Sequence, residues 1–593
     1  MSAASPLRSR PRAMLVAAAL LASVAASLAA GCGGKRGSSV LLITLDTTRA
    51  DHLGCYGYPL PTTPNIDALA AKGVVFEQAY APMPQTLPTH ATLFTGLPPR
   101  AHKAVENAHP LPEGLATLAE TLAARDYETA AFIGSLVLDE STGIARGFTV
   151  YDQPKGVQRD IQHEVERSAA AVTDSALSWS LARHFSAKPF LLWAHYYDPH
   201  GPYEPREQRI PAQAVEPQVR QHAELGALAP DALRDTAAIW FGYDNELAYM
   251  DAHVGRLLKG LEQRKMLDDT VVVVVGDHGE GLMEHGEKSH GATLFQELML
   301  VPLIVVLPDG SRGGTRIQGV VQIQDLLPTI LDLAGHADAA GGHPGLNLAP
   351  AIRGGGELPA RPVFFERPYY VPDSLRGGRA LAHGWGFGEM AGVVDGHDKL
   401  IRLPPDPQTK RVASQLYDLA ADPDELRDLA AERPDTVARL SALLDEWLAR
   451  YPMDGEVEAP LLSAEHEAAL NALGYAGGDD GGGEASPVPV PASAPRPTLD
   501  ALSAEAAQAD RATLEARIDA CRTSVAGKEQ EIASLKARIE EQAASLEAPA
   551  TASDAARDEL ERLQAQLQGL QQDLVDLTAT LEVFTAELAR RPG

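Results

Sequence analysis

Short apolar runs that end abruptly in polar residues recur along the first two thirds of the chain. Residues 271–275 are five valines, too short and too β-branched for a helix, so they predict a strand buried on both faces. Residues 40–45, 190–195 and 301–307 have the same character. An amphipathic pattern over residues 244–265 predicts a helix before the valine run. Strands alternating with helices predict an α/β domain.

Acidic residues directly follow two of these runs. Asp46 follows residues 40–45, and Asp277 and His278 follow the valine run after Gly276. The carboxyl ends of strands in open α/β sheets form the crevice where ligands bind, and carboxylates beside an imidazole are typical metal ligands. A turn or helix cap is the alternative role for Asp46.

A helix is predicted to begin at Pro88 in the segment PMPQTLPTHATLFTGLPPR, residues 82–100. Thr86 then lies just before the helix amino terminus, where free N–H groups and the helix dipole favour an anion. A metal ion on the Thr oxygen can convert this weak nucleophile into an alkoxide. Thr86 is therefore a candidate nucleophile, and an ordinary N-cap is the alternative.

The net charge restricts the range of partners. The formal charge of −29 over 593 residues argues against nucleic acid, because binding it needs clustered Lys and Arg. The length predicts two to four domains. Three cysteines, at positions 32, 55 and 521, are too few for a disulfide framework.

The amino terminus has the composition of an export signal. Three arginines at positions 8, 10 and 12 precede an apolar run over residues 14–30, which is too short to span a bilayer. The run ends in LAAGC, which resembles a lipobox with Cys32 as the lipidated first residue of a bacterial lipoprotein. We therefore expect residues 1–32 to be a signal peptide and the protein to reach the periplasm or the outer surface of a membrane. A plain cleaved signal peptide is the alternative.

The carboxyl-terminal part has a different pattern. Residues 476–498 are rich in Gly and Pro and predict a linker. Within residues 499–593, apolar positions alternate spacings of three and four, which predicts a coiled coil. The clearest seam is Leu560, Leu563, Leu567, Leu570, Leu574, Leu577, Leu581, Phe584 and Leu588. The helices either fold back as an antiparallel hairpin or pair between chains, so self-association stays open.

Six segments in order resemble the sulfatase family of the alkaline phosphatase superfamily, over roughly residues 38–475. They are LITLDTTRADHLGCYGY around Asp46, TLPTHATLFTG, HYYDPHGPY, GDHGE, QIQDLLPTILDLAG and QLYDLAADPDELRDL. The resemblance implies an alkaline-phosphatase-like α/β sandwich with a central mixed sheet and a smaller C-terminal subdomain. It also implies one divalent metal ion between the strand ends.

The resemblance also assigns roles to individual residues. It makes Asp46, Asp277, His278 and Thr86 the metal ligands, with Thr86 at the nucleophile position. His200 matches the histidine on the substrate or acid–base side. His290 falls where a lysine often contacts the leaving group, and an imidazole there could donate a proton. His90 replaces the arginine of the family motif, and it is a weaker and pH-dependent anion partner.

The departures from the family pattern bear on the chemistry. Typical sulfatases carry CxPSR or SxPSR, in which Cys or Ser becomes formylglycine, whereas residues 86–90 read TLPTH. Thr cannot become formylglycine, so its ester must be released by water or another acceptor. This resembles the phosphatase, phosphonate-hydrolase and phosphoethanolamine-transferase branches of the superfamily. The first strand end has Asp46 followed by Thr47 in place of two Asp, which favours Zn²⁺ or Mn²⁺, with Ca²⁺ as the alternative.

Other polar residues are predicted to be part of the scaffold. Glu280, Glu284 and Glu287 are expected to face solvent, with His285 either beside them or a competing metal ligand. His195 is expected to pack beneath the DPHGPY turn, and Ser135 receives no catalytic role. Residues 204–235 predict an insertion that covers the cleft.

The sequence thus predicts an exported, metal-dependent hydrolase that cleaves a phosphate, phosphonate or sulfate ester of a small molecule, glycan or lipid. One alternative is transfer of a phosphoryl-containing group, resembling phosphoethanolamine transfer, to an envelope glycan or lipid. The other is a decayed catalytic domain on a lipoprotein that acts as a scaffold through its coiled coil.

Overall fold

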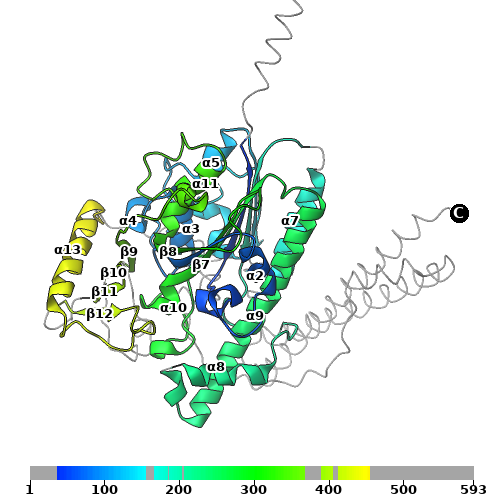
Figure 1. The fold of residues 1–593 in the computed structure, drawn as a ribbon. Coiled ribbons are helices and arrows are strands. Elements are labelled where there is room, and N and C mark those ends of the chain that lie inside the picture. The colour runs from blue at the N-terminus through cyan, green and yellow to red at the C-terminus, as the bar shows by residue number, and fades with distance from the viewer. Residues whose placement is uncertain are drawn as a thin grey trace, which may run out of the picture. The chain divides into compact units, whose positions relative to one another are not determined.

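An eight-stranded mixed sheet forms the centre of the protein (Figure 1). The computed structural model describes residues 37–453 except 108, 155–165, 184–185, 204–205, 223, 368–388 and 405–411. The predicted signal peptide, linker and coiled coil lie outside these residues. In spatial order the strands are β4 (Val150–Asp152), β3 (Glu128–Ile133), β5 (Phe190–Tyr196), β1 (Ser39–Leu45), β6 (Thr270–Gly276), β7 (Leu300–Val306), β2 (Val74–Tyr80) and β8 (Thr315–Gln322).

All strands except β7 run in the same direction. β7 is antiparallel to both β6 and β2, and every other neighbouring pair is parallel. The carboxyl ends of seven strands therefore open at one edge of the sheet. The four apolar runs predicted as strands are β1, β5, β6 and β7, which confirms the α/β prediction and the central mixed sheet.

Both faces of the sheet are buried, which explains why its strands are continuous apolar runs. Val40 and Leu42 of β1 pack on one face, and Leu41 and Ile43 pack on the other. The first face is covered by helices α3 (Thr86–Thr95), α5 (Leu118–Ala123) and α11 (Leu326–Leu333). The second is covered by α2 (Pro64–Ala70), α7 (Ala169–Ala182) and α9 (Pro230–Gln263).

Helix α9 is longer than predicted. It begins at Pro230, fourteen residues before the expected start at Asp244, and Pro occupies the first helical position, where its missing N–H is not needed. Leu233 and Trp240, in the unpredicted part, are buried in the same core as the rest of the helix. The predicted insertion therefore supplies the first turns of α9.

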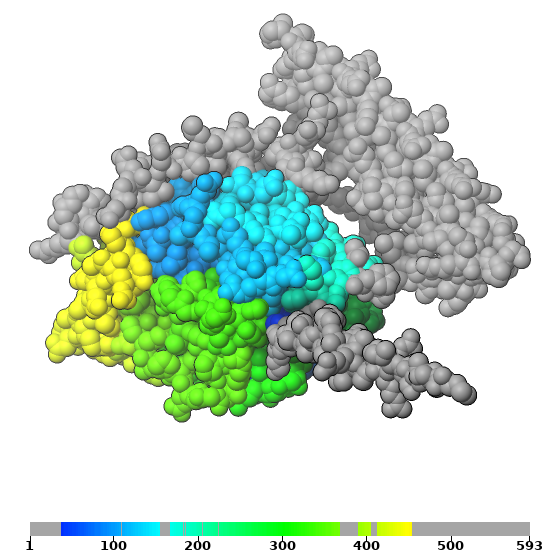
Figure 2. Space-filling model, turned by 90° about the horizontal axis from the view of Figure 1, so that it is seen from above, coloured from blue at the N-terminus to red at the C-terminus, as the bar shows by residue number. Residues whose placement is uncertain are grey.

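A smaller antiparallel sheet forms a C-terminal subdomain, as predicted. Its order is β12 (Ser414–Asp418), β11 (Asp398–Arg402), β10 (Met390–Asp395) and β9 (Val363–Arg367), and α13 (Pro434–Arg450) packs on it. Arg100 Nε lies 2.6 Å from Glu366 Oε2, and Lys103 Nζ donates to the carbonyl of Pro452 at 3.0 Å. Figure 2 shows the yellow surface of this subdomain against the blue and green surface of the main body.

Short helices complete the described part of the chain. The α-helical ones are α4 (Pro99–His102), α8 (Glu216–Gln221), α10 (Gln296–Met299) and α12 (Ala349–Ile352). The 3₁₀ helices are η1 (Ala50–His52), η2 (Gly54–Tyr56), η3 (Leu136–Leu138), η4 (Glu140–Thr142), η5 (Ala212–Ala214), η6 (Leu225–Ala227), η7 (Glu284–Gly286) and η8 (Ile323–Asp325). Among the described helices, none combines the length and the apolar content needed to cross a bilayer.

Candidate active site

Asp46 and Asp277 meet because their strands are neighbours. β1 and β6 pair in parallel, with Leu45 opposite Gly276, so the chain leaves both strands at the same point. One ligand atom each from Asp46, Asp277 and His278 lie within 4.8 Å of one another, and all three side chains are buried. The structure therefore brings together the three residues predicted to be metal ligands.

The carboxylate oxygens of this cluster are arranged for a cation. Oδ1 of Asp277 accepts hydrogen bonds from the backbone N–H groups of Thr47 at 3.1 Å and His278 at 2.7 Å. Oδ2 of Asp277 and both oxygens of Asp46 have no hydrogen-bond partner among the described residues. Buried carboxylate oxygens without partners are strongly destabilising, and a divalent ion would satisfy them. The helix that follows, η1, has Arg49 as its N-cap, so Asp46 does not cap it.

Burial and mutual repulsion act on the protonation of these groups. Burial, and then the nearby charges of Asp277 and Glu280, raise the pKa of Asp46 well above its ordinary value. Burial raises the pKa of Asp277 to about 6. Two neighbouring carboxylates that resist ionisation need a positive charge between them to be stable at neutral pH, so the residues present fit a divalent metal ion.

His278 is held in the tautomer that a metal ligand requires. Its Nδ1 donates to the carbonyl of Gly279 at 2.9 Å, which leaves the Nε2 lone pair on the side of the carboxylates. Nε2 lies 4.0 Å from Asp46 Oδ1 and 3.8 Å from Asp277 Oδ2. Burial lowers the pKa of His278 to about 3, so the imidazole is neutral and available as a ligand.

Thr86 lies against this cluster at the start of α3. The helix begins at Thr86 itself, two residues before the predicted start, and its N-cap is Gln85. Thr86 is therefore not the N-cap. Its Oγ1 lies 3.3 Å from His278 Nε2, which places the candidate nucleophile beside the predicted metal ligands.

His90 lies one helical turn after Thr86. Its Nδ1 donates to the Thr86 carbonyl at 2.8 Å and lies 3.8 Å from Asp277 Oδ2. Burial lowers the pKa of His90, so the ring is neutral, and its buried Nε2 carries a lone pair with no partner in the described part of the chain. A neutral ring that presents a lone pair cannot donate to an oxyanion from Nε2.

His200 and His290 form the other side of the site. Their ring centroids lie 5.0 Å apart, and the His290 ring lies 4.5 Å from that of His278. His200 Nδ1 lies 2.6 Å from the carbonyl of Gly201. His290 Nδ1 lies 3.0 Å from Oε1 of Glu280, and both side chains are buried. The structure thus places both predicted acid–base histidines near the metal cluster.

The prediction that the acidic residues after β6 face solvent was wrong. Glu280, Glu284 and Glu287 are 3%, 2% and 8% exposed. Glu284 Oε1 accepts from Arg49 Nη1 at 2.8 Å, and Glu287 Oε2 accepts from the hydroxyl of Thr293 at 2.9 Å. The loop turns back over the strand ends, so charges that the sequence suggests are solvated find partners inside.

His285 is occupied by a carboxylate and lies outside the metal cluster. Its Nδ1 lies 2.8 Å from Oε1 of Glu297, and its ring stacks on Phe295 with centroids 3.7 Å apart. Its backbone N–H donates to Oε2 of Glu224 at 2.9 Å. Glu224 belongs to the predicted insertion, which therefore contacts the loop after β6.

Two residues near the site were missed from the sequence. His195 is buried, as expected, but the contact of its Nε2 with Asp46 Oδ2, at 3.5 Å, was not predicted. A signal was present, since His195 is the first polar residue after the apolar run over residues 190–194, as Asp46 is after residues 40–45. Asn107 has no such signal, because it lies in an irregular loop; its Oδ1 accepts from the Leu87 N–H at 2.9 Å, and its Nδ2 has no partner among the described residues.

Ser135 has a structural hydrogen bond at the start of η3. It is the N-cap of that helix, and its Oγ accepts from the N–H of Val137 at 3.3 Å.

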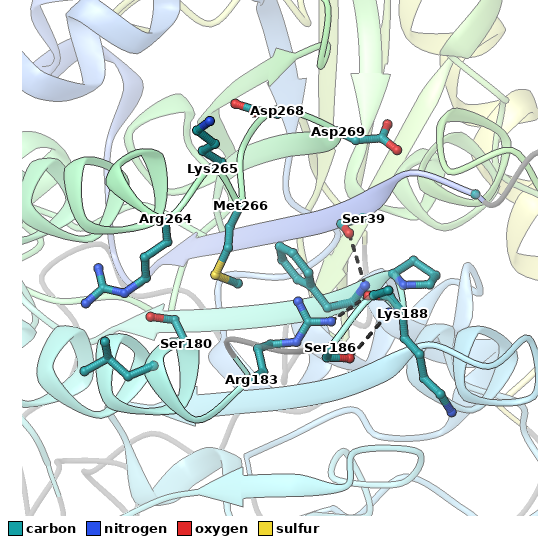
Figure 3. Close-up of a pocket in the computed structure, with 15 residues that line it drawn as sticks. Ser39, Ser180, Arg183, Ser186, Lys188, Arg264, Lys265, Met266, Asp268 and Asp269 are labelled. Carbon is teal, nitrogen blue, oxygen red and sulfur yellow. Dashed lines mark hydrogen bonds between the residues drawn. The ribbon is translucent and has the colours of Figure 1, made fainter.

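A cavity of about 360 Å³ lies at the opposite end of the sheet (Figure 3). It is lined by residues around the starts of β1 and β5, the end of α7 and the turn after α9. Figure 3 shows Lys188, Arg264 and Lys265 pointing away from one another. Arg183 is committed to Glu128 at 2.7 Å and lies over the Phe190 ring. The basic groups do not converge, and the cavity is separate from the metal cluster.

Comparisons with known proteins point to one family. The family model described as Sulfatase matches residues 38–336. A Delta 4,5-hexuronate-2-O-sulfatase of Bacteroides thetaiotaomicron is 25% identical over 458 residues, 70% of this chain and 89% of the relative. An uncharacterized sulfatase of Escherichia coli is 26% identical over 440 residues, 66% of this chain and 82% of the relative.

Two solved structures share the fold. A protein in complex with its substrate D-glucosamine-2-N,6-O-disulfate superposes with a TM-score of 0.57 at 21% identity, over 72% of this chain and 100% of the other. A phosphonate monoester hydrolase of Agrobacterium radiobacter superposes with a TM-score of 0.51 at 22% identity, over 70% and 96%.

Proposed function

The chain belongs to the sulfatase family of metal-dependent ester hydrolases, and from this premise we propose that it cleaves a phosphate, phosphonate or sulfate ester through the hydroxyl of Thr86. One observation carries the proposal: Thr86 Oγ1 lies 3.3 Å from His278 Nε2, next to two buried carboxylates whose free oxygens fit a cation. A divalent ion held by Asp46, Asp277 and His278 would lower the pKa of the Thr86 hydroxyl and draw charge from the ester.

The chemistry of this chain's residues follows in two displacements. Thr86 Oγ gives up its proton to solvent and forms a bond to phosphorus or sulfur, while the bond to the leaving oxygen breaks. The leaving oxygen takes a proton from a histidine on the other side of the site, and His290 is the residue we assign. Water then attacks the Thr86 ester, and Thr86 regains a proton as the acid is released.

Three features of the site serve this reaction. Burial raises the pKa of Glu280 to about 7, and a protonated Glu280 that donates to Nδ1 of His290 at 3.0 Å keeps the ring proton on Nε2; when Nε2 protonates the leaving oxygen, the Glu280 proton passes to Nδ1. Thr86 lies at the amino terminus of α3, whose dipole stabilises negative charge that develops there. The unpartnered Nδ2 of Asn107 is a donor that we assign to an oxygen of the transferred group.

Phosphate and phosphonate esters fit this site better than sulfate esters. A formylglycine hydrate expels sulfate by collapsing to an aldehyde, whereas a Thr ester must be hydrolysed. His90, where the family motif has arginine, does not supply a permanent positive charge, since burial lowers its pKa. The phosphonate monoester hydrolase among the structural relatives shares the fold, and the substrate class comes to this chain only as part of this proposal.

Zn²⁺ or Mn²⁺ is the ion we assign to the site. Asp46 and Asp277 each offer a carboxylate oxygen to the cluster, His278 offers a nitrogen, and Thr86 offers a hydroxyl. Four donors that include an imidazole suit these ions better than Ca²⁺, which takes six to eight oxygen ligands.

The position of Cys32 bears on the choice between hydrolysis and transfer to a lipid. If Cys32 is lipidated, the five steps to Gly37 span at most about 18 Å. Gly37 directly precedes β1, whose seven residues extend for about 23 Å toward Asp46. In Figure 1, α5 and α11 mark the end of the sheet where β1 begins, and α10 marks the opposite end, near the site. In an anchored protein the attachment point and the site would thus be at opposite ends of the sheet, which supports a soluble or glycan ester over a lipid of the anchoring bilayer.

A panel of aryl esters tests the proposal. Metal content is measured first, and then 4-nitrophenyl phosphate, phenylphosphonate and sulfate are offered to the wild type and to Thr86→Ala. We expect the wild type to prefer the phosphorus esters and the variant to lose turnover. Reaction in ¹⁸O-labelled water separates hydrolysis, which labels the released acid, from transfer to an added alcohol. Undiminished activity of Thr86→Ala removes Thr86 as the nucleophile, and a protein without metal or turnover supports the scaffold alternative.

A further inference from the structure

We propose that His195 is a positioning residue that donates a hydrogen bond from Nε2 to Oδ2 of Asp46 and thereby leaves only Oδ1 of that carboxylate to a metal ion. The proposal rests on the metal site of the proposed function. It assigns to His195 a part in the choice of metal, because a carboxylate with one oxygen occupied serves as a monodentate ligand.

The sheet register fixes the contact between the two side chains. β5 lies beside β1, and His195 is paired with Thr44, two residues before Asp46. Both His195 and Asp46 are fully buried. Nε2 lies 3.5 Å from Oδ2 and has no hydrogen-bond partner among the described residues. This separation exceeds an ordinary hydrogen bond by a few tenths of an ångström, and catalytic contacts often shorten only when the site is loaded.

Neighbouring groups decide which nitrogen of His195 carries the proton. The indole N–H of Trp193, which can only donate, points to Thr44 Oγ1 at 2.9 Å. Thr44 Oγ1 lies 3.2 Å from His195 Nδ1. If the Thr44 hydroxyl donates to Nδ1, the proton of the imidazole is on Nε2 and faces the carboxylate. The donors then run in one direction, from Trp193 through Thr44 and His195 to Asp46.

The opposite tautomer, with the proton on Nδ1, is unfavourable at both ring nitrogens. A proton on Nδ1 would leave the buried Thr44 hydroxyl without an acceptor in the described part of the chain, and it would turn the Nε2 lone pair toward a carboxylate oxygen. The proton of the ring therefore belongs on Nε2.

The arrangement at Asp46 matches the one at Asp277. There, Oδ1 is occupied by the N–H groups of Thr47 and His278, and Oδ2 is left for the cation. With His195 on Oδ2, Asp46 likewise keeps one oxygen, Oδ1, which is the one that lies 4.0 Å from His278 Nε2. Two monodentate carboxylates favour an ion of low coordination number over Ca²⁺, which often takes bidentate carboxylates.

Metal affinity measured by calorimetry on the full chain tests the assignment. We expect His195→Leu to weaken Mn²⁺ binding by about 10- to 100-fold, as loss of a hydrogen bond to a metal ligand does. Ca²⁺ binding should weaken less, because Asp46 becomes free to bind with both oxygens. His195→Gln, which keeps an N–H near the position of Nε2, should retain most of the Mn²⁺ affinity.

Two further variants control for damage to the fold. His102→Leu removes another buried imidazole, whose partners are Thr92 and the N–H of Ala104, and it should leave both affinities unchanged. Thr44→Val keeps His195 but removes the hydroxyl that keeps the ring proton on Nε2, so it should also weaken Mn²⁺ binding. Wild-type affinities in both His195→Leu and Thr44→Val overturn the proposal while the metal site stands. A wild type that binds no divalent ion overturns both the role of His195 and the metal site of the proposed function.

Discussion

Glu280 Oε1 lies 3.0 Å from Nδ1 of His290, in a pair buried beside the metal cluster. A glutamate in the sequence GDHGE gives no sign of this contact, because the nine residues between the two partners have no apolar periodicity. In the structure that loop returns to the strand ends, and Gly281 N–H donates to the carbonyl of Ser289 at 3.0 Å. The carboxyl group of Glu280 can therefore orient the imidazole.

Replacing His290 should affect esters according to their leaving group. His290→Ala removes the proton donor, so an alkyl ester should lose about 10²- to 10⁴-fold in kcat/KM. A 4-nitrophenyl ester should lose much less, because its leaving group departs without a proton. Glu280→Ala should show the same trend to a smaller extent. Equal losses for the two esters would show that His290 binds the substrate without acting as the acid.

Thr86→Ala should abolish covalent catalysis. We expect a fall on the order of 10³-fold or more in kcat with metal affinity lowered only modestly, because two aspartates and His278 remain. Thr86→Ser keeps the hydroxyl and should keep measurable turnover. Thr95→Ala is the matched control in the same helix, since Thr95 Oγ1 donates only to the carbonyl of Ala91 at 2.6 Å and caps the Leu97 N–H. Turnover by Thr86→Ala equal to that of Thr95→Ala would remove the nucleophile assignment.

The parts predicted well from sequence are those that local pattern determines. Apolar runs gave the four strands because both faces of the sheet are buried, and polar residues at strand ends gave Asp46, Asp277 and His278. The start of α3 was placed two residues late, since Pro88 is compatible with any position in the first turn. His195 and Asn107 acquire their roles only from contacts between distant segments, which a single sequence does not encode locally.

Metal removal should lower thermal stability, and Asp46→Asn should reverse part of that loss. A bound ion at a hundredfold excess over its Kd adds about 2.7 kcal/mol. Without metal, the raised pKa of Asp46 means that its ionisation destabilises the fold as pH rises through the folded-state pKa. At pH 8 with a chelator, Asp46→Asn should therefore melt above the metal-free wild type but below the loaded wild type.

A second buried aspartate gives the control for this experiment. Asp325 accepts from the N–H groups of Gln322 at 2.8 Å and Leu346 at 2.7 Å and pairs with Arg361. Asp325→Asn should therefore lower the melting temperature by the same amount with and without chelator. If Asp46→Asn also lowers the melting temperature by the same amount with and without chelator, Asp46 does not bind a metal ion.

The His285–Glu297 pair should make stability fall at alkaline pH. Its partner Glu297 raises the pKa of His285 to about 9 against the opposing effect of burial. A raised folded-state pKa stabilises fully below the unfolded value near 6.5, and this stability is lost as pH rises from about 6.5 to 9. The expected loss is about 3 kcal/mol. Urea unfolding at pH 6, 7.5 and 9 should show a steeper loss in the wild type than in His285→Gln, in which the buried carboxyls still titrate; equal slopes in the two proteins would exclude the pair as the cause.

Cys32→Ser should separate anchoring from catalysis. A lipidated wild type would fractionate with membranes and the variant with the soluble fraction, while both should hydrolyse a soluble aryl ester at the same rate, because the site lies at the far end of β1 from Gly37. An ester on a lipid of the anchoring bilayer should be no better a substrate for the wild type than for the variant. A wild type that cleaves such a lipid much faster would mean that the site reaches its own membrane, and it would favour the transferase alternative. A wild type found only in the soluble fraction would instead support the plain signal peptide, with the assignment of Thr86 unaffected.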